Sequence, residues 1–446
     1  MRLLSTYILC GCLLASVCRA QSKKNNYPDY LQPDHAINAV TMVMVHDVTS
    51  PPVAARYYAY CMLPAYNIVS ANNEAMPAVQ TFVKAFKSSG SLDTSKGKYD
   101  TRIAAYYSIL ETARQLLPSG FMLQDDEDAF LQLLKKLKVN NEVINASVQV
   151  AKLATADVIA FSRTDHYGEL SALKRYTPLK DESKWYPTPP GYFEAVEPNW
   201  KTIRTLVIDS AEQYKPSALT PFSKDSTSAF YKGVRAVYEA SKTLTTDELN
   251  QALFWDCNPF AITSSGHMAI GYKKISPGGH WMHIAGLAAR KAGLNFDESV
   301  MVATIEGFTL MDAFISCWEG KYASNRLRPE TYINRYIDQK WQPVLQTPPF
   351  PEYTSGHAVI SYASAEVLTY LLGDNFAYTD NTEIPFGSGE RDFKSFLNAA
   401  AEASMSRFYG GIHYKESIEN GNLQGQNIGK GIINKIAKAG IKPVRH

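Results

Sequence analysis

Apolar residues recur at helical spacing along most of this chain, and this periodicity restricts the fold more than any other feature. Residues 54–69 are rich in alanine and tyrosine, with apolar residues three and four positions apart. The same spacing recurs over residues 101–117, 126–137, 145–163 and 247–254. Alternating apolar and polar residues, which are typical of strands, are rare and short. The sequence therefore predicts a mainly α fold of packed helical bundles.

A proline-rich segment at residues 178–198 interrupts the helical pattern. Repeated prolines favour an extended connection over a helix, so this segment is the best candidate for a domain boundary. We predict two packed helical bundles, an N-terminal one at residues 21–185 and a C-terminal one at residues 186–446. The pattern is also compatible with a single core shared by both.

The first residues are typical of a secretory signal peptide. Arg2 gives a short positive segment, residues 3–17 are largely apolar, and Ala20 is a small residue at a cleavage site. We expect a signal peptide at residues 1–20 and a periplasmic or secreted mature protein. Three cysteines lie in this segment, but no clean lipoprotein signal precedes any of them, so lipid anchoring is the less favoured alternative.

Composition excludes several classes of protein. The formal net charge of +2 over 446 residues gives no general attraction to nucleic acid or to anionic membranes. Beyond the signal peptide, we expect no apolar run to be long enough to span a bilayer. The mature part keeps Cys61, Cys257 and Cys317, an odd number that does not indicate a disulfide scaffold. Oligomeric state is left open.

Three short motifs in the last third of the chain carry the residue types that an oxyanion site needs. They are spread over less than a hundred residues and supply cations, small residues at a helix start and histidines: Lys321-x6-Arg328-Pro329, Ser355-Gly356-His357 and Arg407-x5-His413. A second Ser-Gly-His, Ser265-Gly266-His267, lacks these flanking partners and is interpreted as a chance occurrence.

The first motif is predicted to end a long helix over residues 297–326, with Asp297 as its N-cap. Lys321 and Arg328 are seven residues apart, close to two turns, so both side chains can lie on one face. Pro329 disfavours helix at the residue before it and should end the element there. Taken alone, the pair would be interpreted as two solvated surface charges; the downstream motifs favour a shared anion pocket.

The second motif is predicted to begin a helix, because residues 357–372 have helical period and the residues before them break it. Free N–H groups and the positive end of the helix dipole make Ser355 and Gly356 a natural anion site. His357, in the first turn, suits acid/base work. The simpler alternative is that Ser355 is only an N-cap and His357 a surface residue.

The third motif is predicted to close a helix at residues 392–409, with Arg407 in its last turn and His413 just beyond Gly410-Gly411. The planar guanidinium suits an oxyanion, and His413 can offer a nitrogen to the anion's central atom. A helix-end cation beside a loop histidine is the alternative. Farther on, glycines four residues apart should let the next helix pack closely on a neighbour: Gly421, Gly425 and Gly429.

Together and in this order, the motifs resemble the superfamily of vanadium-dependent haloperoxidases and type 2 phosphatidic acid phosphatases, in particular its bacterial iodoperoxidase-like members. Looser similarity extends upstream through residues 50–56 and 255–259. The resemblance implies vanadate as cofactor, in a site that phosphate can also occupy. It implies His357, His413 and Lys321 as catalytic residues and His413 as the vanadium ligand. The oxygens of vanadate would be held by Lys321, Arg328, Ser355, Gly356 and Arg407.

Trp318 and Phe350 are predicted to form an apolar rim at the substrate site, although core packing explains such aromatics nearly as well. The favoured function is oxidation of a halide, iodide or bromide, by hydrogen peroxide. A soluble periplasmic acid phosphatase acting through a phosphohistidine, and a non-catalytic phosphate- or vanadate-binding protein, are the alternatives. Ser417 stands where the phosphatases have an orienting aspartate, which we interpret as lowering phosphatase activity.

Overall fold

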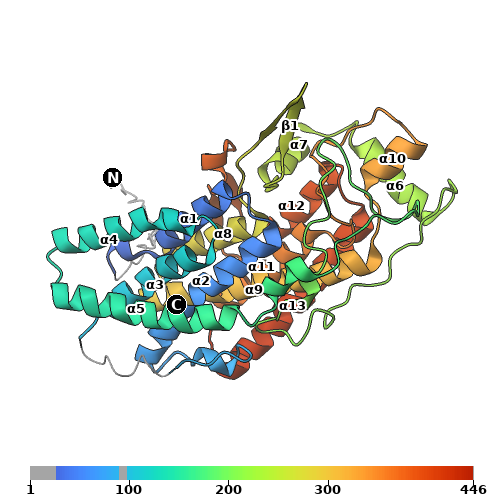
Figure 1. Ribbon diagram of the computed structural model, residues 1–446. Coiled ribbons are helices and arrows are strands. Elements are labelled where there is room, and N and C mark those ends of the chain that lie inside the picture. Colours follow the sequence, from blue (N-terminus) through green and yellow to red (C-terminus); the bar gives the residue numbers. More distant parts are fainter. Residues whose placement is uncertain (1–26, 90–97, 445–446) are drawn as a thin grey trace, which may run out of the picture.

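The computed structural model describes residues 27–89 and 98–444, so the expected signal peptide lies outside the described residues. Within them the chain is built from helices joined by loops, with two small antiparallel hairpins (Figure 1). The helices are α1 (Pro33–His46), α2 (Pro51–Asn72), α3 (Thr101–Leu116), α4 (Gln124–Lys136), α5 (Asn141–Ser162), α6 (Ala229–Ala240), α7 (Thr246–Phe254), α8 (Pro277–Ala292), α9 (Phe296–Ser324), α10 (Pro329–Tyr336), α11 (Gly356–Leu372), α12 (Phe396–Tyr409) and α13 (Lys415–Ala439). The mainly α prediction is confirmed.

The hairpins are short, and the second contributes Tyr378 and Phe393 to the buried core. Strand β1 (Ile262–Ser265) pairs with β2 (Met268–Gly271), and β3 (Tyr378–Asp380) pairs with β4 (Arg391–Phe393). The chance Ser-Gly-His motif lies at the turn of the first hairpin, where His267 is exposed. Residues 178–198 contain no helix, as their prolines predict.

The central helix is α9, which lies with α11 between the α3–α5 end of the molecule and the α6–α10 end (Figure 1). A capping box at Asn295 and Glu298 starts it, so the cap is Asn295 and not the expected Asp297. Gly307 lets α9 approach α2 closely, since a Cβ there would lie 3.3 Å from the Cα of Ala59.

The predicted glycine stripe on α13 packs against α11. A Cβ at Gly421 would lie 2.9 Å from the Cβ of Ala358, and one at Gly429 would lie 2.7 Å from that of Glu366. Both separations are too short for any larger residue without movement of the helices. The close packing brings α13 directly beneath the start of α11, where the backbone N–H of Ser355 donates to the carbonyl of Ser417 at 3.2 Å.

One hydrophobic core runs through both predicted bundles. Its buried side chains extend from Tyr27 to Val444, and helix α2 of the N-terminal bundle packs on α9 of the C-terminal one. This arrangement agrees with the alternative that both bundles share a single core. The boundary between residues 185 and 186 stays a prediction.

Two segments, residues 141–172 and α9, are long and apolar enough to cross a membrane, contrary to the expectation that no run would reach that length. The apolar window of α9 is entirely buried within the protein, and 44% of the window in residues 141–172 is buried. A helix that other helices surround on all sides is apolar around its whole circumference, and this gives it the composition of a membrane-spanning helix.

Candidate active site

Three buried cations come from three separate segments of the chain. Lys321 lies in the last turn of α9, Arg328 directly before α10 and Arg407 in the last turn of α12, and all three side chains are buried. Burial lowers the pKa of Lys321 to about 8 and that of Arg328 to about 10, and it also lowers the pKa of Arg407. Such costly burial of charge needs compensation by an anion or by dipoles.

The prediction that Lys321 and Arg328 share one helix face is wrong. Helix α9 ends at Ser324, and the chain turns through Asn325, which has a left-handed φ of 51°. Arg328 then has extended backbone as the N-cap of α10. Both cations still lie beside the same side chain, each 5.1 Å from the centre of the Phe350 ring.

Lys321 is held by backbone carbonyls of the loop before α11. Its ammonium donates to the carbonyls of Pro351 at 3.1 Å and Glu352 at 3.2 Å, and also to that of Thr354. A lysine ammonium has three donors, so these carbonyls together account for its full capacity. The lysine therefore shapes the loop that carries Ser355 as well as contributing charge.

Ser355 and Gly356 begin α11, as predicted. The hydroxyl of Ser355 makes no capping hydrogen bond, although the residue is in the N-cap position. It is buried and has no hydrogen-bond partner within the described residues. The N–H groups of the first turn likewise lack carbonyl partners within the helix, so this end offers several donors to one small region.

His413 follows the turn at Gly411, whose φ of 76° only glycine adopts readily. Its Nδ1 lies 2.8 Å from Oε1 of Glu352, and its Nε2 lies 3.0 Å from Nη1 of Arg328. A guanidinium N–H can only donate, so Nε2 must accept and the proton is on Nδ1. Burial, Arg328 and Lys321 hold the pKa of His413 well below its ordinary value. The neutral ring thus keeps a lone pair on Nε2.

Glu352 is the residue that the sequence analysis missed. Its Oε1 accepts from Nδ1 of His413 and, at 3.1 Å, from the backbone N–H of Tyr414. Ser417 is a weaker partner of His413, with its hydroxyl 3.4 Å from Nδ1. A carboxylate therefore orients the imidazole from the loop before α11, so the argument that Ser417 leaves His413 poorly oriented is wrong. The only signal was a glutamate three residues before Ser355.

His357 lies in the first turn of α11. Its Nε2 is 3.1 Å from the carbonyl oxygen of Trp255, which can only accept, so Nε2 carries the proton and Nδ1 is left as the basic nitrogen. Burial, together with the charge of Arg407, lowers the pKa of His357 well below its ordinary value. A neutral imidazole with a free Nδ1 is equipped to accept a proton.

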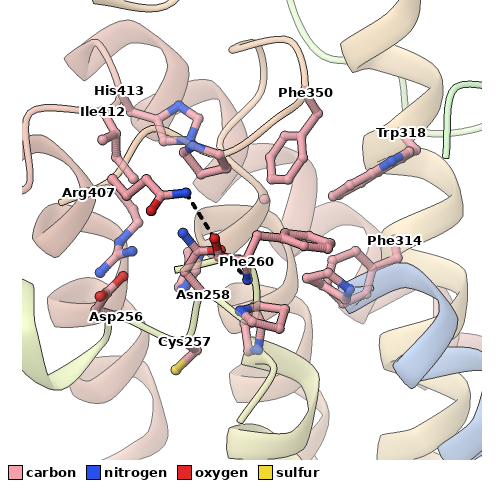
Figure 2. Close-up of a pocket in the computed structure, with 17 residues that line it drawn as sticks. Asp256, Cys257, Asn258, Phe260, Phe314, Trp318, Phe350, Arg407, Ile412 and His413 are labelled. Atoms are coloured by element: carbon pink, nitrogen blue, oxygen red, sulfur yellow. Dashed lines mark hydrogen bonds between the residues drawn. The ribbon is translucent and has the colours of Figure 1, made fainter. Parts of the chain in front are cut away.

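A narrow pocket lies beside these groups, is lined by some of them and has an aromatic wall. Arg407, His357, Gly356 and His413 line it on the polar side. Figure 2 shows Trp318, Phe350 and Phe314 opposite Arg407, with His413 above them. The rings of Trp318 and Phe350 are 4.9 Å apart, and both lie within 6 Å of the Lys321 ammonium, at 5.6 Å and 5.1 Å. The predicted rim and the predicted cations therefore occupy one site.

The donors fit a tetrahedral or trigonal-bipyramidal oxyanion such as vanadate. Among the described residues, Nη2 of Arg328 and the hydroxyl of Ser355 are buried without a partner. Unpaired buried donors are costly, and an anion's oxygens would satisfy them. His413 adds a lone pair for the central atom, which an oxyanion bound through its oxygens alone would not need.

Comparison with known proteins agrees with this chemistry. Residues 301–439 match the family model of the VCPO second helical-bundle domain. The structure is similar to that of a bacterial vanadium-dependent iodoperoxidase, with 38% sequence identity, a TM-score of 0.84, and coverage of 91% of this chain and 95% of that one.

More distant structures share the fold. A holo-type bacterial vanadium-dependent chloroperoxidase is 14% identical with a TM-score of 0.65, over 95% of this chain and 99% of that one. An apo-type bacterial chloroperoxidase is also 14% identical, with a TM-score of 0.64, over 88% and 95%. No protein with a curated description matches. The identity and coverage shared with the iodoperoxidase show that this chain belongs to the vanadium-dependent haloperoxidases, a family of enzymes.

Proposed function

We propose that this haloperoxidase oxidises iodide, and bromide less readily, with hydrogen peroxide to hypohalous species, using vanadate as its cofactor. The observation that carries the proposal is the pairing of an accepting Nε2 on His413 with unpartnered buried donors on Arg328 and Ser355. The 38% identity to a bacterial iodoperoxidase supports iodide as the first choice. The expected signal peptide makes a periplasmic or secreted location part of this proposal.

Each residue has a distinct task. Lys321, whose three N–H groups donate to backbone carbonyls, would contribute positive charge beside the anion. Arg328, Arg407, Ser355 and the first-turn amides at Gly356 would hold the vanadate oxygens, and Nε2 of His413 would bind the vanadium. Bound vanadate would supply a Lewis acid that activates hydrogen peroxide toward halide. His357 would take up a proton at Nδ1, because its Nε2 is committed to the carbonyl of Trp255.

The aromatic wall supports a small, polarisable substrate. Trp318 and Phe350 are buried and present ring faces and edges beside the Lys321 ammonium. A large, weakly hydrated anion such as iodide loses less solvation in such a pocket than a phosphate ester does. The wall would also keep water from the site and so protect the oxidising product from side reactions.

An acid phosphatase remains the second candidate, because of one observation. Glu352 orients His413 through Nδ1, which is the arrangement that a nucleophilic histidine needs. Phosphate and vanadate are both tetraoxo anions, so phosphate would occupy the same donors.

The deciding experiment is a side-by-side assay of vanadium-free protein. With vanadate and peroxide we expect iodide oxidation above bromide oxidation, and excess phosphate should suppress it by competing for the site. Without vanadate, a phosphate ester should be turned over weakly or not at all. Robust ester hydrolysis with no halide oxidation at any vanadate concentration would promote the phosphatase.

A pair of histidine variants tests the two assigned roles. His413→Ala should abolish vanadate retention, since it removes the vanadium ligand, whereas His357→Ala should keep most retention and lower turnover by about 10²-fold or more. The measurement is vanadium content per chain after dialysis, with iodide oxidation of the loaded protein. Equal vanadium content in wild type and His413→Ala would rule out the ligand role.

A further inference from the structure

A second cluster of ligand-type side chains lies next to the active site and has no part in the oxyanion cradle. Cys257 follows α7, His280 lies on α8 and Glu383 directly precedes a 3-10 turn at Ile384–Phe386. All three are buried. The Cys257 sulfur lies 3.4 Å from Nδ1 of His280 and 3.5 Å from Oε1 of Glu383, and that oxygen lies 3.0 Å from the same Nδ1.

We propose that Cys257, His280 and Glu383 bind one divalent transition-metal ion, with Zn²⁺ as the best fit, in a site separate from that for vanadate. Thiolate, imidazole and carboxylate are the donors that zinc takes in proteins. For ordinary zinc bond lengths in a tetrahedron, the ligand atoms are separated by about 3.4–3.6 Å. The three separations in the structure are at, or slightly below, these values, so the site needs only a small expansion to hold the ion.

The far side of His280 supports the same assignment. Its Nε2 lies 2.7 Å from Oδ2 of Asp380, a buried carboxylate that also accepts the backbone N–H of Thr382 at 3.0 Å. Metal-binding histidines commonly donate their second N–H to a carboxylate in this way, which fixes the tautomer and aims the other nitrogen at the metal. Asp380 would therefore be a positioning residue, not a ligand.

The charges also allow the exchange of protons for metal. Each ring nitrogen of His280 faces a carboxylate oxygen, with Nδ1 3.0 Å from Oε1 of Glu383 and Nε2 2.7 Å from Oδ2 of Asp380, so both nitrogens carry protons before a metal binds. Binding would release one proton from the thiol and one from the imidazolium as one divalent ion enters. The net charge of the cluster is unchanged by this exchange, so the surrounding protein need not rearrange to compensate.

The metal would brace the loop that positions His357. The ring of Trp255 stacks on His280 at 4.5 Å, and the carbonyl of Trp255 accepts from Nε2 of His357. Cys257, two residues on, lines the active-site pocket (Figure 2). An ion bound at Cys257 would thus join the loop that contains Trp255 and Cys257 to α8 and to the segment after β3.

The test uses Co²⁺ as a spectroscopic probe on vanadium-free wild-type protein. We expect one equivalent to give a thiolate-to-cobalt charge-transfer band and tetrahedral visible bands, and Zn²⁺ to bleach both. Adventitious binding at surface histidines gives no thiolate band. Absence of the band, together with no Zn²⁺ retained through gel filtration, would overturn the proposal on the wild type alone.

Matched variants locate the site. Cys257→Ala should lose the charge-transfer band, while Cys61→Ala, another buried free cysteine, and His283→Gln, on the same helix as His280, should keep it. Circular dichroism verifies that each variant is folded. Vanadate retention is measured separately, so a negative result at the metal site can be distinguished from a negative result at the vanadate site. A band that persists in Cys257→Ala would refute the ligand assignment.

Discussion

At the scale of single residues, the orientation of His413 depends on Glu352 more than on the hydroxyl of Ser417 in α13. We expect Glu352→Gln to weaken vanadate binding by about 10- to 100-fold, because a neutral amide accepts the Nδ1 proton less strongly than a carboxylate does. Ser417→Ala is the control and should change binding little, since that hydroxyl is 3.4 Å from Nδ1. Titration of each vanadium-free variant with vanadate measures its dissociation constant. The opposite ranking would make Ser417 the orienting residue.

From the pKa of Lys321 we predict a pH dependence of vanadate binding near pH 8, where Arg328, with a pKa of about 10, stays charged. Its pKa of about 8 lies below the ordinary lysine value because burial disfavours the charge, so the ammonium loses its proton progressively as the pH rises through 8. An oxyanion prefers the ammonium, so the contribution of Lys321 to vanadate affinity should fall by up to about tenfold per pH unit above 8.

Lys321→Met separates this effect from the ionisation of vanadate itself. At pH 7 the variant should bind vanadate about 10- to 100-fold more weakly than wild type. The ratio of the two dissociation constants cancels the ionisation of the ligand, and it should shrink as the pH rises from 8 to 10. A ratio that stays constant over this range would mean that the ammonium keeps its proton.

At the scale of helices and loops, Asp312 of α9 fixes the loop at residues 206–208. Its carboxylate oxygens accept the backbone N–H groups of Leu206, Val207 and Ile208 at 2.7, 2.7 and 2.8 Å, all within the core. Asp312→Ala would leave three buried donors unpaired, so the free energy of unfolding should fall by about 3 kcal/mol. Urea denaturation measures it. Asp209→Asn, an exposed position in the same segment, should have little effect.

The elements themselves were largely predictable because their apolar spacing is local. Residues 54–69 and 145–163 are helical in the structure, as α2 and α5, and the breaker Thr354-Ser355-Gly356 does precede a helix. The ends of helices were predicted less accurately. The helix expected at residues 392–409 starts only at Phe396, because the preceding residues form strand β4. Strand β4 has only three residues, too few to show the alternating pattern that would have indicated its pairing with β3.

The sequence allowed us to predict which residues form the site, but not how they are arranged in space. The spacing of Lys321 and Arg328 favoured one helix, but the left-handed turn at Asn325 separates them. The contact of Glu352 with His413 joins two loops sixty-one residues apart, and no spacing rule reports such a contact. The cluster of Cys257, His280 and Glu383 was missed for the same reason, since each residue lies alone in sequence.

At the scale of the whole molecule, the active site is supported from both halves of the chain. Helix α9, which carries Trp318 and Lys321, packs on α2 around Gly307, and α11, which begins at the site, packs on α9 and α13. A single buried core that crosses the predicted boundary favours one cooperative unfolding unit. Two separate bundles would instead unfold independently, and only the C-terminal one would sense a ligand.

Calorimetry with and without vanadate distinguishes these cases. Vanadate at about 100 times its dissociation constant adds about 2.7 kcal/mol to the stability of whatever unit binds it. We expect one transition for the vanadium-free protein, and we expect vanadate to move the entire transition upward because the site belongs to the common core. His413→Ala, which lacks the vanadium ligand, should show the same single transition without the shift. Two transitions of which only one responds to vanadate would establish separate bundles and restore the boundary near residue 185 as a physical one.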